Sequence, residues 1–100
     1  MDNYCLSLLC SPQTEDRLLD LLLESTGDTL FTSSRAYSHG APHEILSIEE
    51  QVLGRRPMVL VQVLLNKDAL EPLISSLAHS FAGLGLTYWA TSVAQQGKIK

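Results

Sequence analysis

The segment 57–65 constrains the fold most strongly, because it is apolar on both faces of an extended chain. Successive side chains of a strand point to opposite faces. One face carries Val59, Val61, Val63 and Leu65, and the other carries Met58, Leu60 and Leu64. Only Gln62 interrupts this pattern. The segment therefore predicts a central strand of a sheet that is covered on both sides.

The first half of the chain indicates a strand, a helix and a second strand. The segment 3–10 is dense in Leu, Tyr and Cys, as is typical of a central strand. Ser11 is a suitable N-cap for a helix with Pro12 in its first position, and Gly27 should end that helix after Glu24. The segment 28–38 is rich in Thr, Ser and aromatic residues, which predicts a half-solvated strand.

The second half repeats this order after a polar loop. Within the loop, Ser47 and Glu50 have the spacing of a capping box, which predicts two turns of helix before Gly54. After the apolar strand, Asn66 or Asp68 should cap a longer amphipathic helix that ends at the glycines of segment 83–85. The segment 86–93 is a fourth strand, with Tyr88 and Trp89 on opposite faces, and a polar tail follows.

This order predicts an α+β fold of the ferredoxin-like βαββαβ type, with two helices on one face of a four-stranded antiparallel sheet. The helices cover only one side, yet the segment 57–65 is apolar on both. Each Å² of apolar surface removed from water contributes roughly 25 cal/mol. We therefore expect copies of the chain to cover the second face, in an assembly with closed cyclic symmetry.

Composition narrows the function classes. One hundred residues with 45% apolar side chains are expected to form one domain, residues 1–100. A formal net charge of −4 argues against a nucleic-acid partner, since Arg55 and Arg56 form the only adjacent basic pair. Because no signal peptide or membrane-spanning segment is visible, we expect a cytoplasmic protein without membrane insertion.

Cysteine chemistry and catalysis receive little support from the sequence. Cys5 and Cys10 are five residues apart in one predicted strand, so they should lie on opposite faces and form no disulfide. Neither has a neighbouring histidine or helix N-terminus that would activate its thiol. Glu49 and Glu50 point about 100° apart on a helix, and the capping role explains them. We expect no enzymatic activity.

The long loop 38–56 holds most of the candidate site residues. His39 and His43 are four residues apart, and Glu44 follows directly, so imidazoles of this loop could share a Zn, Cu or Ni ion. In the alternative interpretation they are ordinary exposed residues or partner contacts. Tyr37, Arg55 and Arg56 flank the loop and complete its candidate ligand-binding or partner-binding surface.

The order of elements, the long loop and the run from Gly40 to Leu46 resemble the PII signalling family and its CutA-like relatives. The segments 31–39 and 47–52, with Tyr88 and Trp89, more closely resemble a small uncharacterised PII-like family, often encoded near heavy-metal efflux pumps. The resemblance extends over nearly the whole chain.

This resemblance implies a homotrimer that binds a small ligand in clefts between subunits and contacts a partner protein through its loop. His43 and Glu44 match a His and a Glu on the PII loop, whereas Gly40 lies near the place of the PII glutamine that contacts magnesium and nucleotide. Gly83 and Gly85 keep the glycines of the phosphate-binding turn without its lysine, so they are either an anion-binding turn or a chain stop.

Two functions remain open at this stage, beside a third possibility, an oligomerising ferredoxin-like domain with no small ligand. The first is a PII-like regulatory module with an unidentified ligand and no assigned cofactor. The second is a soluble metal-binding accessory of an efflux system that uses His39 and His43, with a membrane transporter as its partner.

Overall fold

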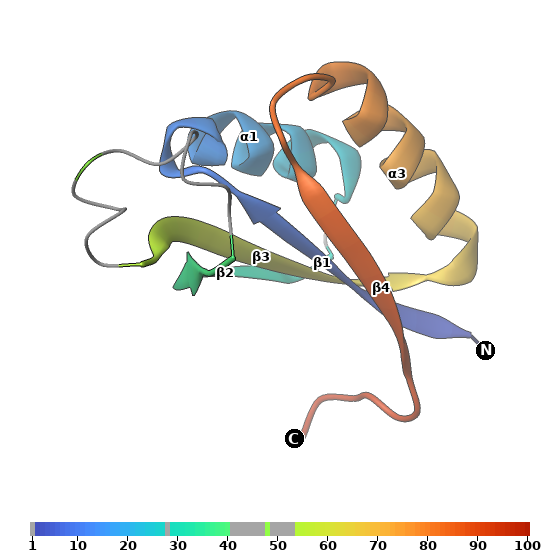
Figure 1. Ribbon diagram of the computed structural model, residues 1–100. Helices are drawn as coiled ribbons and strands as arrows, with labels where there is room; N and C mark the ends of the chain where they lie inside the picture. The colour runs from blue at the N-terminus through green and yellow to red at the C-terminus, as the bar shows by residue number, and fades with distance from the viewer. Residues whose placement is uncertain (1, 28, 41–47, 49–53) are drawn as a thin grey trace.

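The computed structural model describes residues 2–27, 29–40, 48 and 54–100. Four strands and two long helices follow one another in these ranges (Figure 1). They are β1 (Asn3–Cys10), α1 (Glu15–Ser25), β2 (Phe31–Ser38), β3 (Arg56–Asn66), α3 (Lys67–Ser80) and β4 (Thr87–Val93). Of the helix predicted for 47–53, only Ile48 is described, and its backbone is helical. The rest of that segment, as well as His43 and Glu44, lies outside the described residues.

The four strands form one antiparallel sheet in the order β2-β3-β1-β4. Both helices lie on the same side of this sheet, as Figure 1 shows. This arrangement confirms the predicted α+β, ferredoxin-like fold. The strands β2 and β4 form the two edges, and β1 and β3 form the centre.

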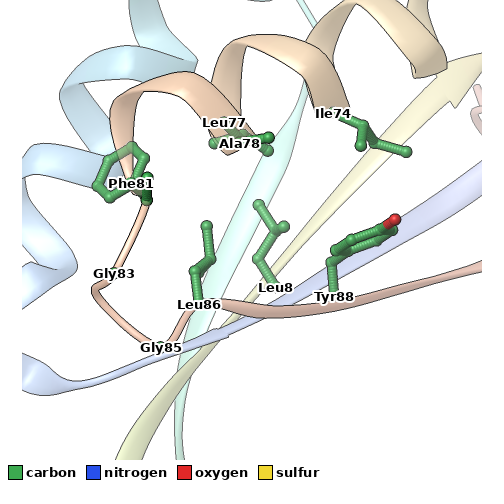
Figure 2. A pocket seen from close by; sticks show the side chains of 10 residues that line it. Leu8, Ile74, Leu77, Ala78, Phe81, Gly83, Gly85, Leu86 and Tyr88 are labelled. Carbon is green, nitrogen blue, oxygen red and sulfur yellow. The ribbon is translucent and has the colours of Figure 1, made fainter.

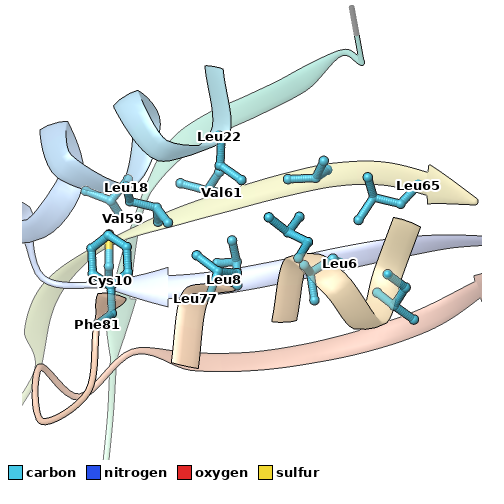
Figure 3. Close-up of a cluster of buried hydrophobic side chains, with 13 residues drawn as sticks. Leu6, Leu8, Cys10, Leu18, Leu22, Val59, Val61, Leu65, Leu77 and Phe81 are labelled. Atoms are coloured by element: carbon cyan, nitrogen blue, oxygen red, sulfur yellow. The ribbon is translucent and has the colours of Figure 1, made fainter. Parts of the chain in front are cut away.

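The core lies between the helices and the sheet (Figure 3). Leu6, Leu8, Leu18 and Leu22 are inaccessible to solvent, as are Val61 and Val63 of β3. Cys10 packs among these side chains, whereas Cys5 lies on the other face of β1, and both thiols are free. The predicted separation of the two cysteines is therefore correct.

The start of α1 differs from the prediction. Ser11 does not cap the α-helix, because a 3-10 turn, Pro12–Thr14, precedes it and α1 begins only at Glu15. The Ser11 hydroxyl pairs instead with the Thr14 hydroxyl at 2.8 Å. Pro12 tolerates this turn because the first turn of a helix leaves its N–H groups unpaired in any case.

The predicted start of β2 at residue 28 is also wrong, because β2 begins at Phe31. Gly27 takes a φ of +60°, and the Thr29 N–H donates to the Thr26 carbonyl oxygen at 3.1 Å. Thr29 therefore belongs to a turn, and not to the strand to which the sequence pattern had assigned it. At the other strands the boundaries agree with the sequence within one residue: β3 is one residue longer at each end, and β4 begins one residue later.

The helix α3 follows β3 directly. Asn66 caps it, with its side-chain oxygen accepting from the Ala69 N–H at 2.9 Å. Pro72 is the sixth residue of the helix, past its first turn, and α3 continues through it to Ser80. Leu70, Leu73 and Leu77 face the sheet, while His79 is exposed, as the helical spacing predicts.

The second face of the sheet carries no helix (Figure 1). Residues paired across antiparallel strands point to the same face, so the pairs Leu9–Leu60, Cys5–Leu64 and Ser7–Trp89 define this open face. Trp89 is 44% exposed and Leu64 is 36% exposed. The apolar composition predicted for this face is thus accompanied by real exposure within a single subunit.

Candidate functional site at the base of the loop

The two strands that border the loop 38–56 place its flanking residues side by side. Tyr37 pairs with Pro57, and Ser38 pairs with Arg56. Arg55 lies two residues before Pro57, so strand alternation directs it to the same side of the sheet as Pro57 and its partner Tyr37. Its guanidinium carbon lies 4.1 Å from the centroid of the Tyr37 ring. The candidate residues Tyr37 and Arg55 are therefore in contact.

The guanidinium of Arg55 is not fully satisfied by the part of the chain that the structure describes. Its Nε is buried and has no hydrogen-bond partner among the described residues. A buried donor without a partner costs about 1–3 kcal/mol, and more when the group is charged. Stacking on an aromatic ring holds the guanidinium plane in place but leaves its N–H edge available. The arrangement favours an acceptor at this edge.

A hollow of about 410 Å³ lies beside this pair, between the start of α1 and the edge strand β2. Its walls include Glu15, Arg35, Tyr37, Pro57 and Met58. Arg35, Arg55 and Arg56 are three of the seven Lys and Arg residues of a chain whose net charge is −4. The hollow itself is lined by the cationic Arg35 and the anionic Glu15, and Arg55 stacks on its Tyr37 wall. Two of these three charges are positive, which suits a small anionic molecule.

The predicted metal ligands are only partly placed. His39 follows β2 directly and is exposed. Its predicted partner His43 lies outside the described residues. Among the described residues, no three His, Cys, Asp or Glu side chains gather in a way that could hold a metal ion.

The glycine turn lies at the other edge of the sheet. Gly83 and Gly85 have φ angles of +80° and +73°, and they connect α3 to β4. Both line an apolar hollow next to the end of α3 (Figure 2). Two central strands separate β4, which follows this turn, from β2, which carries Tyr37, so one subunit does not bring the two predicted binding elements together.

The hollow beside α3 was missed by reasoning from the sequence. Its walls come from residues that the helical and strand patterns assign to the core. Only the hollow seen in the structure shows that the core is incompletely filled between α3 and β4. No sequence signal of the kind used above would have found it.

The ferredoxin-like fold of this chain is shared by PII-like and CutA proteins of known structure. A DUF3240 protein from Shewanella baltica has the same fold, with a TM-score of 0.80 and 16% identity over 98% of this chain and 97% of that one. CPII, a nitrogen regulatory PII-like protein from Thiomonas intermedia K12 bound to ADP, AMP and bicarbonate, has a TM-score of 0.73 at 13% identity, over 99% of this chain and 98% of that one. The divalent cation tolerance protein CutA from Archaeoglobus fulgidus has a TM-score of 0.68 at 11% identity, over 98% and 89%.

The sequence profile of one family, described as protein of unknown function (DUF3240), matches residues 1–100. The chain belongs to the DUF3240 family. No curated protein matches it in sequence. This membership and the structural neighbours confirm the predicted resemblance to an uncharacterised family of PII-like and CutA-like proteins. None of the described helices is long and apolar enough to cross a membrane.

Proposed function

We propose that this protein is a PII-like trimeric regulatory protein. It binds a small anionic ligand at the base of the loop, in clefts between subunits, and contacts a partner protein through the loop 38–56. The observation that carries the proposal is the Arg55 guanidinium, stacked on Tyr37 at 4.1 Å with a buried, unpartnered Nε among the described residues.

The open face of the sheet supports the assembly. Its apolar side chains are exposed in one subunit, and burying them against other copies would remove that surface from water. The edge strands β2 and β4 would then approach those of neighbouring copies. Such an approach would bring the glycine turn of one subunit toward the loop base of the next.

The structural neighbours support the choice of ligand class. The Thiomonas protein is bound to ADP, AMP and bicarbonate, and all three are anions. The cationic loop base of this chain suits the same chemistry, although Gly83 and Gly85 lack the lysine of a phosphate-binding turn. ADP, AMP and bicarbonate are therefore the first probes.

Calorimetric titration of the full chain with ADP, AMP and bicarbonate tests the proposal. We expect at least one of them to bind, and Arg55→Ala to weaken it tenfold or more, because a hydrogen bond to a charged group contributes about 1.5–3 kcal/mol. Lys67→Ala is the matched control, since it also removes one positive charge but lies at the start of α3. Absence of binding, or equal affinity in the two variants, would contradict the proposal.

A metal-binding accessory function is the second candidate. It is favoured by the exposure of His39 at the base of the loop and by the divalent cation tolerance proteins among the structural neighbours. Equilibrium dialysis with Cu, Zn and Ni should show binding that His39→Ala and His43→Ala together abolish. Unchanged binding in the double variant would dismiss this function, whatever the nucleotide titrations give.

A further inference from the structure

The hollow beside α3 is a separate feature, at the sheet edge opposite the loop base. It has a volume of about 260 Å³ and lies on the helix face, between α3 and β4. Figure 2 shows side chains from three elements turned toward it. They are Leu8 of β1, Ile74 and Leu77 of α3, and Tyr88 of β4, with Phe81 and Leu86 on the connecting segment.

The floor of the hollow is deep in the protein, and its mouth is open. Leu8 is inaccessible to solvent, and Leu77 and Phe81 are each 4% exposed. Tyr88, at the mouth, is 54% exposed. A molecule that entered would reach the hydrophobic core from the surface without unfolding either element.

The Phe81 wall is fixed in place by contacts behind it. Arg17 of α1 stacks on Phe81, with its guanidinium carbon 5.1 Å from the ring centroid, and it also donates to the Ser80 carbonyl oxygen at 3.2 Å. At the rim, a Cβ built on Gly83 or Gly85 would meet nothing within 4 Å. The chain therefore leaves room at the rim that its own side chains do not fill.

The chemistry of the walls selects an uncharged ligand. Of the described residues that line the hollow, Tyr88 alone has a polar side-chain atom, its hydroxyl. The carbonyl end of α3 comes next to the glycine turn, and its partial negative charge disfavours an anion there. A cation would find no carboxylate among these lining residues.

The size and the aromatic walls select a flat ring. Apolar cavities of about 150 Å³ stay dry and bind benzene, so a larger hollow with the same kind of lining can hold a fused pair of rings. Aromatic rings pack on one another with centroids about 4.5–7 Å apart, and both Phe81 and Tyr88 offer such a surface. We propose that the hollow between α3 and β4 binds a small uncharged aromatic molecule of up to two fused rings. One polar atom of this ligand would pair with the Tyr88 hydroxyl.

This inference does not rest on the proposed function at the loop base. The ligand class differs, the two hollows share no lining residue, and the Arg55 variant leaves this hollow intact. The two proposals therefore fail or succeed separately.

Methyl NMR of the full chain with benzene and with indole tests the inference. We expect both probes to shift the methyl signals of Leu8, Ile74 and Leu77 in a saturable manner, while those of Leu60 and Leu64 on the open face stay in place. Tyr88→Phe should weaken the binding of indole several-fold and leave the binding of benzene unchanged, because only indole has an N–H group that can donate a hydrogen bond to the hydroxyl oxygen. Absence of shifts up to the solubility limit, or shifts confined to the open face, would overturn the inference.

Variants that fill the hollow provide the control. Ala78 lines the hollow and is exposed, so Ala78→Phe should place a ring in the mouth of the hollow and weaken the binding of indole at least tenfold. His79→Phe adds the same ring to the neighbouring position, which does not line the hollow, and should bind indole like the wild type. Should Ala78→Phe fail to fold, Ala82→Phe blocks the same hollow from the connecting segment. Unaltered indole affinity in a folded blocking variant would refute the site.

Discussion

At the scale of single residues, Leu22 and Leu23 are neighbours in α1 with opposite surroundings. Leu22 is inaccessible to solvent, whereas Leu23 is 63% exposed. Leu22→Ala should lower the free energy of unfolding by about 2–5 kcal/mol, because it removes core contacts and leaves a cavity. Leu23→Ala, with the same change in composition, should alter it by less than about 0.5 kcal/mol. Urea denaturation of both variants measures the difference, and equal losses would contradict the packing of α1.

The Cys10 thiol makes the stability of the folded protein depend on pH in the alkaline range. Burial raises the pKa of Cys10 above its ordinary value, and the Glu15 carboxylate adds to the shift. Above the ordinary thiol pKa the unfolded chain loses this proton while the folded chain keeps it, so the folded state loses stability as pH rises. Stability should therefore fall between about pH 8 and pH 10 more steeply in the wild type than in Cys10→Ala. Parallel profiles in urea denaturation across this range would contradict the burial of the thiol.

At the scale of elements, α3 depends on its cap. The Asn66 side chain accepts from the Ala69 N–H, which would otherwise lack a partner at the helix start. Asn66→Ala should destabilise the protein by about 0.5–2 kcal/mol, whereas Asn66→Asp should retain most of the stability because aspartate accepts the same bond. Thermal unfolding monitored by circular dichroism compares the three proteins. A loss in Asn66→Asp as large as in Asn66→Ala would show that the cap is not what matters.

The elements themselves were predictable from the sequence because their patterns are strong and local. The alternation in β3 and the helical spacing of Leu70, Leu73 and Leu77 each indicate one kind of structure. The errors fall at boundaries, where the turn at Gly27 and the 3-10 turn after Ser11 compete with the regular pattern. Local hydrogen bonds decide such boundaries, and the periodicity of apolar residues does not report them.

The candidate site was predictable in part. Tyr37 and Arg55 flank the loop and were both singled out, but their contact follows from the register of β2 against β3, which pairs Tyr37 with Pro57. A shift of one residue would turn Tyr37 to the opposite face. The hollow beside α3 depends on how closely a helix packs against an edge strand, and no pattern along the chain encodes that distance.

At the scale of the whole molecule, we propose that copies of the chain contact one another through the open face of the sheet. Leu60 lies on this face of the central strand β3, opposite Leu9. Leu60→Asp would place a charge in any interface formed there, at a large desolvation cost, and should dissociate the assembly. His79→Asp, on an exposed helix position, adds a carboxylate elsewhere and should leave the assembly intact. Sedimentation velocity distinguishes the two, and an intact assembly in Leu60→Asp would place the interface on another surface.

The mass of the particle in solution tests the central claim most directly. Copies of the chain must cover the open face if the clefts proposed to hold the ligand are to exist. Light scattering of the wild-type protein during size-exclusion chromatography at dilute concentration measures this mass. We expect a single species of three times the 11.0 kDa chain mass. A particle of 11.0 kDa would contradict the trimer, its clefts and the regulatory function built on them.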